Sequence, residues 1–424
     1  MSKLRKMYHS LQSDPFPEDL RLSLGDRELS YTKQTWLIGG SDKGLRYGEN
    51  PDQPAAVYAC RRGDLQLGEV DFRQPGLSLL SGLKTEQMLQ SGKHPGKINI
   101  TDVDNGINIL QYLQAKPAAV ILKHNNPCGA AWSDQGILTA VNKAYFSDRI
   151  AAFGGTVVLN SPLSKEAAAF MSELYFEVVA APEYEAGALE LLMQRPNLRI
   201  LHIPGLADLE ALSATPYLDV TSLVDGGLIL QFSFQNRIRS EEDFLPAQAE
   251  QDGHTVLARK PTPQEFEDLL FAWAVEAGVT SNSVIFAKNG ATVAIGTGEQ
   301  DRVGCVDLTI YKASIKYADK LSFEETGLSL YQLRTQARQD ESSAKILESI
   351  EQRTRIAQNG LFGSVAVSDG FFPFRDGVDL IIDQGVTAIA QPGGSVNDRE
   401  VIEAVNEADP QVAMVFTGQR SFKH

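Results

Sequence analysis

The chain has 424 residues, enough for two or three domains and a large hydrophobic core. Hydrophobic residues make up 43% of it and charged residues 22%, as in ordinary globular proteins, and the formal net charge is −15. A surface of this charge repels phosphate backbones and anionic lipid, so no nucleic-acid or membrane partner is expected. A local basic pocket for a small anion is compatible with it.

The cysteines and the N-terminal residues indicate the cellular compartment. Cys60, Cys128 and Cys305 lie far apart, and no pair has the spacing of metal ligands or of a secreted disulfide framework. Residues 1–14 lack the apolar core of a signal peptide, and no apolar run approaches the ~18 residues of a membrane helix. We therefore expect a cytoplasmic protein.

Short apolar runs alternate with stretches of helical period along the chain. The runs predicted to be buried strands are 118–122, 156–159, 176–181, 283–287, 292–296, 364–367, 386–390 and 412–416. Residues 164–175 and 398–409 have helical period. This alternation predicts an α/β fold with mostly parallel or mixed sheets.

A polar stretch marks the expected domain boundary. Residues 237–261 mix charged residues with Pro and Gly and have little periodicity, as linkers do. We place the linker at 241–261, between a first domain at 1–240 and a second at 262–424.

A helix is predicted to begin directly after this linker. Thr262 is a suitable N-cap, Pro263 suits the first helical position, and Glu265 completes a capping box. The following residues, to 278, are apolar around much of the helix circumference, which predicts burial between layers.

The end of the strand predicted at 118–122 carries a candidate catalytic pair. Successive side chains of a strand point to opposite faces, so Lys123 and His124 reach one site only if the strand ends here. Asn126-Pro127 is expected to enforce that end, because the residue before proline is disfavoured in the helical region. A neutral histidine can accept a proton, and an ammonium can stabilise developing negative charge. The same pair also occurs where a strand simply meets water.

Other strand ends carry residues suited to ligands, which bind outside the carboxyl ends of strands in open α/β sheets. Arg46 could hold a phosphate or carboxylate, or belong to a surface turn. The aromatic run 371–374, beside Arg375 and Asp376, could cradle a flat heterocycle or contribute rings to the core.

No metal site is expected. Pro127-Cys128 resembles half of a zinc-deaminase signature, but Ala131 stands where the second cysteine should be, and the H-x-E partner motif is missing.

Seven motifs together resemble one family. In chain order they are RYGENP, KHNNPCG, AFGG, SNSVIFAKNG, FFPFRDG, QPGGS and the terminal R-x-F-K-H. This order is similar to that in aminoimidazolecarboxamide ribonucleotide (AICAR) transformylase, the formyltransferase half of a bifunctional purine-biosynthesis protein that also carries IMP cyclohydrolase. The resemblance runs from about residue 40 to the last residue.

The resemblance implies a fold and a reaction. The fold would be two cytidine-deaminase-like α/β subdomains with mixed sheets and no zinc. The reaction would transfer a formyl group from 10-formyltetrahydrofolate to the 5-amino group of AICAR, giving formyl-AICAR and tetrahydrofolate. The resemblance also implies a homodimer with active sites at the subunit interface and a structural potassium ion.

The resemblance also implies a set of site residues. His124 would be the general base, Lys123 would stabilise the oxyanion, Asn282 would orient the transferring group, and His424 would lie near the reacting centre. The nucleotide would be held by Arg46, Tyr47, Gly154, Glu177, Arg420 and Phe422. The folate would be held by Arg302, Val303, Phe371, Pro373, Asp376, Ser395 and Val396.

Several alternatives stay open. A cyclohydrolase domain precedes RYGENP in the full-length family, whereas 45 residues precede it here, so we expect a stand-alone transformylase without IMP cyclohydrolase activity. Another folate-dependent formyltransferase acting on a different phosphorylated amine is one alternative, and a non-catalytic nucleotide-binding protein is another. Formate with ATP could replace the folate as formyl donor.

Overall fold

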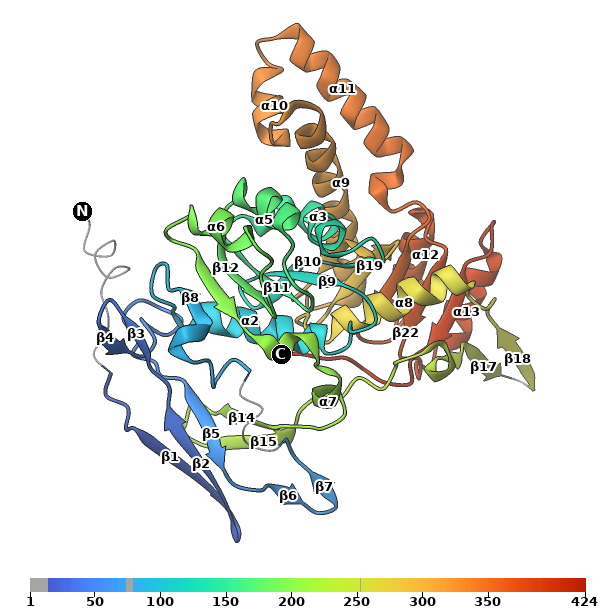
Figure 1. The fold of residues 1–424 in the computed structure, drawn as a ribbon. Coiled ribbons are helices and arrows are strands. Elements are labelled where there is room, and N and C mark those ends of the chain that lie inside the picture. Colours follow the sequence, from blue (N-terminus) through green and yellow to red (C-terminus); the bar gives the residue numbers. More distant parts are fainter. Residues whose placement is uncertain (1–13, 74–78, 252) are drawn as a thin grey trace. The chain divides into compact units, whose positions relative to one another are not determined.

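The computed structural model describes residues 14–73, 79–251 and 253–424 (Figure 1). The N-terminal stretch inspected for a signal peptide lies almost entirely outside these residues. The chain divides into two compact units: unit 1 is Met1–Asn125 with Phe153–Gln235, and unit 2 is Asn126–Ala152 with Asn236–His424. The stretch 241–261, expected to be a linker, belongs to unit 2. Each unit contains sheet and helices, and the predicted α/β class with mixed sheets is confirmed.

Unit 1 is built on five neighbouring strands. In sheet order they are β9 (Ala118–Lys123), β11 (Gly155–Leu159), β12 (Phe176–Ala181), β13 (Arg199–His202) and β8 (Met88–Gln90). The three middle strands are parallel and the two outer ones antiparallel to their neighbours. Helix α2 (Lys97–Leu110) packs against β9 and β11. The apolar runs of β9 and β11 are buried, as continuous hydrophobic strands require.

Smaller elements complete unit 1. The antiparallel strands β1 (Asp19–Leu24), β2 (Arg27–Lys33) and β5 (Tyr58–Arg62) form a separate sheet. The short hairpins pair β3 (Trp36–Ile38) with β4 (Ser41–Lys43), β6 (Gln66–Leu67) with β7 (Val70–Asp71), and β14 (Leu218–Ser222) with β15 (Leu228–Phe232). The helices are α5 (Lys165–Ser172), α6 (Ala188–Met193) and α7 (Glu210–Ser213).

Unit 2 contains a second run of strands. In sheet order they are β16 (Leu245–Pro246), β23 (Ala413–Phe416), β22 (Ala388–Gln391), β21 (Val365–Ser368), β19 (Val284–Lys288), β20 (Ala291–Gly296) and β10 (Asn126–Trp132). Strands β21, β22 and β23 are parallel, and β19 runs antiparallel to β21. The eight strands predicted from apolar runs are all present in the two units, with ends within about two residues of those expected.

The predicted start of helix α8 (Pro263–Glu276) is confirmed. The backbone N–H of Glu265 donates to Oγ1 of Thr262 at 3.3 Å, and the N–H of Thr262 donates to Oε2 of Glu265 at 2.6 Å. The other helices of unit 2 are α3 (Ile137–Ser147), α4 (Arg149–Ala152), α9 (Arg302–Thr326), α10 (Leu330–Gln336), α11 (Glu341–Ile356), α12 (Asp376–Asp383) and α13 (Asp398–Glu407). Among the described residues, no helix is both long and apolar enough to span a membrane.

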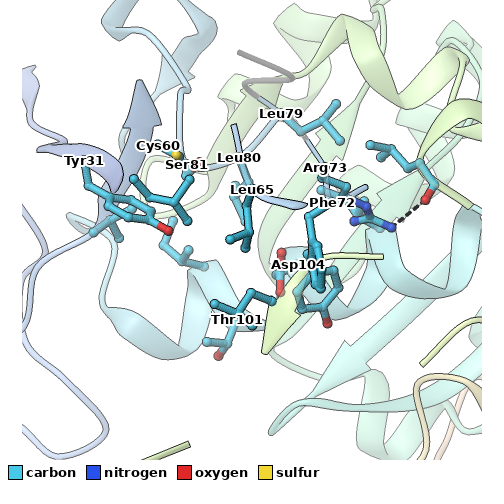
Figure 2. Close-up of a pocket in the computed structure, with 17 residues that line it drawn as sticks. Tyr31, Cys60, Leu65, Phe72, Arg73, Leu79, Leu80, Ser81, Thr101 and Asp104 are labelled. Atoms are coloured by element: carbon cyan, nitrogen blue, oxygen red, sulfur yellow. Dashed lines mark hydrogen bonds between the residues drawn. The ribbon is translucent and has the colours of Figure 1, made fainter. Parts of the chain in front are cut away.

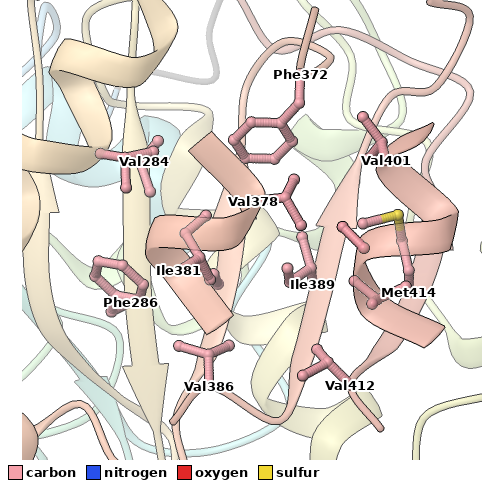
Figure 3. Close-up of a cluster of buried hydrophobic side chains, with 14 of the residues drawn as sticks. Val284, Phe286, Phe372, Val378, Ile381, Val386, Ile389, Val401, Val412 and Met414 are labelled. Atoms are coloured by element: carbon pink, nitrogen blue, oxygen red, sulfur yellow. The ribbon is translucent and has the colours of Figure 1, made fainter. Parts of the chain in front are cut away.

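The main apolar cluster of unit 2 lies between the parallel strands and helices α12 and α13 (Figure 3). Phe286, Ile389 and Met414 from the strands meet Val378 of α12 and Val401 of α13, and all five side chains are buried. Because β21, β22 and β23 are parallel, the loops after them leave the same edge of the sheet. This edge carries the predicted site residues of unit 2.

Candidate active site

A cavity of about 270 Å³ in unit 1 brings together one group of the predicted site residues. Six of the predicted site residues line this cavity: Arg46, Tyr47, Lys123, His124, Gly154 and Glu177. Gly96, Ile98, Asn99, Asp102, Phe153 and Tyr175 also line it. These residues come from distant parts of the chain, so the fold of unit 1 assembles them.

The strand end beside Lys123 is confirmed, but its cause differs from the prediction. Asn126 and Pro127 lie inside β10 rather than in a turn. The reversal is made by His124 and Asn125, whose φ angles of 54° and 60° lie in the left-handed region. Non-glycine residues adopt this region rarely and at a cost, so His124 is held at the tip of a tight turn by its surroundings.

Helix α2 supplies the contacts that hold this turn. The N–H of Asn125 donates to Oδ1 of Asp102 at 2.7 Å, and Nδ2 of Asn105 donates to the carbonyl of Asn125 at 2.9 Å. Oδ2 of Asp102 accepts a bond of 3.3 Å from Thr156. Burial raises the pKa of the Asp102 carboxyl, although these hydrogen bonds and nearby His124 oppose that shift. Asp102 therefore fixes the backbone directly after His124.

Lys123 and Gly154 meet at the other side of the turn. Nζ of Lys123 donates to the carbonyl of Phe153 at 2.6 Å. Gly154 has a φ of 73°, and a Cβ there would lie 3.3 Å from the ring of Tyr175. A side chain at position 154 would therefore be strained and would crowd the cavity.

Arg46 is prepared for an anion. Its Nη2 donates to the hydroxyl of Tyr47 at 2.9 Å, and its guanidinium carbon lies 4.5 Å from the centre of that ring. Nε of Arg46 is buried and has no hydrogen-bond partner among the described residues. A buried, unsatisfied cationic donor is costly, and Arg46 lines the cavity, where its guanidinium could pair with a phosphate or carboxylate.

Glu177 is held by a buried arginine. Nη1 of Arg199 lies 3.4 Å from Oε2 of Glu177, and Nδ2 of Asn99 donates to the same oxygen at 3.4 Å. Burial lowers the pKa of Arg199 to about 10, and the neighbouring Glu177 carboxylate opposes that shift. Glu177 thus presents a fixed acceptor to the cavity.

Apart from Phe153 of the AFGG motif, the sequence interpretation overlooked three polar or aromatic lining residues: Asn99, Asp102 and Tyr175. Asn99 and Asp102 lie three positions apart on α2, as residues on one face of a helix do, and Asn105 continues that row. This polar row on a largely apolar helix was a usable signal. Tyr175 directly precedes a strand, and nothing in its local sequence distinguished it.

The remaining predicted residues lie in unit 2, at the sheet edge where β21, β22 and β23 end. They are Asn282, Arg302, Val303, Phe371, Pro373, Asp376, Ser395, Val396, Arg420, Phe422 and His424. Asn282 precedes β19, which is antiparallel to β21, so it lies at the same edge as the loop after β21. Several contacts join these loops.

Arg302 links three of the loops through its buried guanidinium. Nη1 donates to the carbonyl of Ser283 at 2.9 Å and pairs with Oδ1 of Asp369. Nη2 donates to Oδ1 of Asn282 at 2.8 Å. The arginine expected to contact folate therefore bonds protein acceptors through both terminal nitrogens and orients the Asn282 amide, while Nη2 retains a second N–H donor.

The C-terminal residues are tied to this edge. The N–H of Ser281 donates to the carbonyl of Lys423 at 2.9 Å, and the N–H of Ser421 donates to the carbonyl of Asp369 at 3.0 Å. The Arg420 guanidinium carbon lies 5.3 Å from the ring centre of Phe371. These bonds hold a chain end that would otherwise fray.

The loops after β21 and β22 are joined by Asn397. Its Nδ2 donates to the carbonyl of Pro373 at 2.7 Å, and its N–H donates to Oγ of Ser395 at 3.1 Å. Asp376 is exposed, and Val396 is almost fully exposed, at 98%. An exposed valine on a bonded loop is available to cover an apolar ligand.

A larger cavity of about 400 Å³ in unit 1 contains none of the predicted residues (Figure 2). Its most prominent charged group is Arg73. Nε of Arg73 donates to the carbonyl of Thr215 at 2.9 Å, and Nη2 donates to Leu212 at 2.7 Å and to Gln111 at 2.9 Å. Since protein acceptors already bond this guanidinium, Arg73 is less available to a ligand than Arg46 is in the smaller cavity.

Two carboxylates beside Arg302 have unsatisfied oxygens. Among the described residues, Oδ2 of Asp369 and Oε1 of Glu276 are buried without a hydrogen-bond partner. Burial, and the nearby Asp369, raise the pKa of Glu276 well above its usual value. In the described part of the chain, this pair included, no cluster of three or more His, Cys, Asp or Glu side chains could bind a metal ion.

Comparison with known proteins identifies relatives of the whole chain. The sequence model of a family described as AICARFT/IMPCHase bienzyme matches residues 18–312. The "Bifunctional purine biosynthesis protein PurH" of Magnetococcus marinus is 36% identical over 382 residues, which cover 90% of this chain and 59% of that protein. The protein of the same name from Rhizobium johnstonii is 34% identical over 420 residues, which cover 98% of this chain and 64% of that protein. The chain thus spans about three fifths of the length of the curated relatives it matches.

Proposed function

The chain belongs to the AICARFT/IMPCHase bienzyme family, and from this premise we propose that it is a formyltransferase of purine biosynthesis. It would transfer the formyl group of 10-formyltetrahydrofolate to the 5-amino group of AICAR, giving formyl-AICAR and tetrahydrofolate. One observation carries the proposal: a single cavity is lined by an arginine with an unsatisfied buried donor, a lysine, and a histidine at the tip of a strained turn.

Arg46 and Tyr47 would bind the phosphate of AICAR. The guanidinium has an unsatisfied Nε, and arginine matches phosphate through parallel N–H donors. The Glu177 carboxylate is an acceptor suited to the ribose hydroxyls, and Gly154 leaves room beside them. Arg420 and Phe422 are proposed as further nucleotide contacts.

His124 and Lys123 would carry the chemistry. The amino group of AICAR is a weak nucleophile because its lone pair is delocalised into the imidazole. As its nitrogen bonds to the formyl carbon, His124 would accept the amine proton, and Lys123 would stabilise the oxyanion. The bond between the formyl carbon and N10 of the folate then breaks, and a proton passes to N10. A general base contributes ~10²–10⁴-fold, and one oxyanion donor ~10²–10³-fold.

Asn282 would act as a hydrogen-bond donor in the same reaction. Its Oδ1 already accepts from Arg302, so its NH₂ is the part of the amide that can face the transferring formyl or the carboxamide. His424 is proposed to lie near the reacting centre, at the end of the bonded C-terminal segment.

The loops at the edge of unit 2 would bind the folate. The exposed Asp376 carboxylate can accept from the donor edge of the pterin. Phe371, Pro373, Ser395 and Val396 would cover the ring, with Val303 beside them. Arg302 would hold these loops through its bonds to Asn282, Ser283 and Asp369, and the second N–H of Nη2 would be its donor to the folate.

The potassium ion implied by the family fits the buried oxygens of Asp369 and Glu276. Both lack hydrogen-bond partners among the described residues, and one guanidinium faces two carboxylates. A monovalent cation bound there would be coordinated by the Asp369 oxygen and support the loop around Asn282. Replacing potassium by choline in a thermal unfolding experiment should lower the Tm, and Asp369→Asn should remove that difference.

The deciding experiment is an assay of the purified chain with AICAR and 10-formyltetrahydrofolate, following tetrahydrofolate release. No turnover, with both ligands shown to bind, would overturn the proposal. Formyl-AICAR should accumulate without IMP, and appearance of IMP would contradict the expected lack of cyclohydrolase activity. Homodimer formation, testable by analytical ultracentrifugation, and a cytoplasmic location are proposed on the same family basis.

A further inference from the structure

A cavity of about 250 Å³ in unit 2 lies at the opposite end of the β19–β20 hairpin from Asn282. Helix α3, the turn of the hairpin and helix α9 supply most of its lining. Strand β19 begins just after Asn282 and ends at Lys288, which lines the cavity. Because a strand advances about 3.3 Å per residue, the cavity is separate from the candidate active site.

Three lysines line this cavity: Lys143, Lys288 and Lys320. Nζ of Lys143 donates to the carbonyl of Asn289 at 2.9 Å, and Nζ of Lys288 donates to the carbonyl of Phe362 at 2.7 Å. Each ammonium has three donors, so these bonds orient the groups without exhausting them.

The charge of these lysines is poorly balanced within the protein. In the part of the chain that the structure describes, neither Lys143 nor Lys288 pairs with a carboxylate, and Lys320 has only Glu324 at 4.0 Å. The whole chain has a net charge of −15, so acidic partners are abundant. The Asp268 carboxylate lies against the hairpin turn but accepts from the N–H groups of Asn289 and Gly290 rather than from a lysine. Three ammonium groups around one concave surface therefore outnumber the nearby acids and create a local positive potential that an anion would neutralise.

The rest of the lining suits a flat ring and its polar edge. Phe146 and Tyr317 contribute aromatic faces, and Asn142 and Asn289 contribute amides. The ammonium of Lys320 lies 5.8 Å from the centre of the Phe146 ring, so charge and aromatic surface adjoin. Ligand pockets usually begin at ~300 Å³. This cavity, at about 250 Å³, lies just below that size, so it suits a mononucleotide rather than a dinucleotide.

We propose that this cavity, which we call the lysine pocket, is a second binding site that takes a small phosphate-bearing ligand with a flat ring, of the size of a nucleoside monophosphate. The three ammonium groups hold the phosphate, and Phe146 and Tyr317 contact the ring. The proposal does not depend on the proposed formyltransferase activity, because the two cavities share no residue.

Calorimetric titration with AMP tests the proposal, using Arg46→Gln to weaken competing binding at the first cavity. In that background AMP should bind with a stoichiometry near one, and inorganic phosphate should compete. The added triple change Lys143→Gln, Lys288→Gln and Lys320→Gln should weaken binding about tenfold or more, because each lost phosphate contact is charge-assisted. The triple Gln change at Lys84, Lys165 and Lys260, which are exposed and remote in sequence from the pocket, alters net charge equally and should leave binding intact.

Two further measurements keep the test decisive if the triple variant folds poorly. Among the described residues the Lys320 side chain makes no hydrogen bond, so Lys320→Glu should abolish AMP binding while retaining wild-type circular dichroism. Hydrogen exchange should show protection of residues 288–293 when AMP is added. No saturable binding, equal binding by the pocket and control variants, or protection elsewhere only would overturn the proposal.

Discussion

Nη2 of Arg302 donates a 2.8 Å hydrogen bond to Oδ1 of Asn282, and this bond decides which end of the amide can face a substrate. The same guanidinium pairs with the buried Asp369 and with the carbonyl of Ser283. Arg302, which the sequence suggested as a folate contact, therefore leaves the NH₂ group of Asn282 to act as a donor.

Arg302→Lys should distinguish the effect of orienting the Asn282 amide from the effect of placing a positive charge beside Asp369. Lysine keeps a cation beside Asp369 but cannot serve three acceptors in a planar arrangement. We expect kcat to fall about tenfold or more, with the KM for folate changed much less, because orientation of the amide matters most in the transition state. Steady-state kinetics, with urea unfolding as the control for stability, tests this. A folate KM effect without a kcat effect would favour direct folate binding by Arg302.

His124→Ala should reduce kcat by ~10²–10⁴-fold while AICAR binding largely survives, because a lost general base affects the transition state more than the ground state. Calorimetry and single-turnover kinetics measure the two effects separately. His254→Ala, an exposed histidine on β18 (His254–Leu257), is the matched control. Near-normal kcat in His124→Ala would refute the base assignment.

Arg46→Gln should weaken AICAR binding by ~10–100-fold, the effect of losing one or two charge-assisted hydrogen bonds. The folate KM should change little. The exposed Arg62→Gln removes the same charge from unit 1 and should leave both constants unchanged. Equal loss of affinity in the two variants would indicate a general electrostatic effect instead of a phosphate site.

Asp102→Asn should change the pH dependence of stability. Burial raises the pKa of the folded Asp102 carboxyl above its ordinary value of 3.8. Between the ordinary pKa of the unfolded chain and the raised pKa of the folded protein, the folded protein holds the proton more tightly. The Asp102 carboxyl therefore lowers the free energy of unfolding as pH rises through this range. Asparagine does not titrate, so the variant should lose less stability than wild type over the same rise.

Urea unfolding at closely spaced pH values measures this difference. Asp102→Ala is a useful companion, because it also removes the acceptor for the Asn125 N–H. It should reduce kcat through misplacement of His124, whereas the asparagine variant keeps an acceptor oxygen. Identical pH profiles for wild type and Asp102→Asn would contradict the predicted pKa direction.

Thr262→Ala should lower the free energy of unfolding by about 1 kcal/mol, because the variant loses the side-chain cap on the N–H of Glu265. Ser342→Ala is the control, since Ser342 is an exposed residue in the first turn of α11 and does not cap that helix. Equal destabilisation by the two changes would show that the cap contributes little.

The sequence by itself determined the elements whose signals are local. Continuous apolar runs long enough for a strand predicted β9, β12 and β22, because burial on both faces needs no polar alternation. The signal for the start of α8 was equally local, because both hydrogen bonds of a capping box form within four consecutive residues. Motif order also predicted which side chains would carry the proposed chemistry, before any distance was known.

The tertiary structure decided what depends on contacts between distant segments. The turn after Lys123 lies at His124 and Asn125 because Asp102 and Asn105 hold a left-handed backbone that local preference disfavours. The role of Arg302 likewise followed from Asp369, which is 67 positions away. Sequence patterns report what one segment prefers, whereas a binding site is made where several segments meet, and only packing selects those partners.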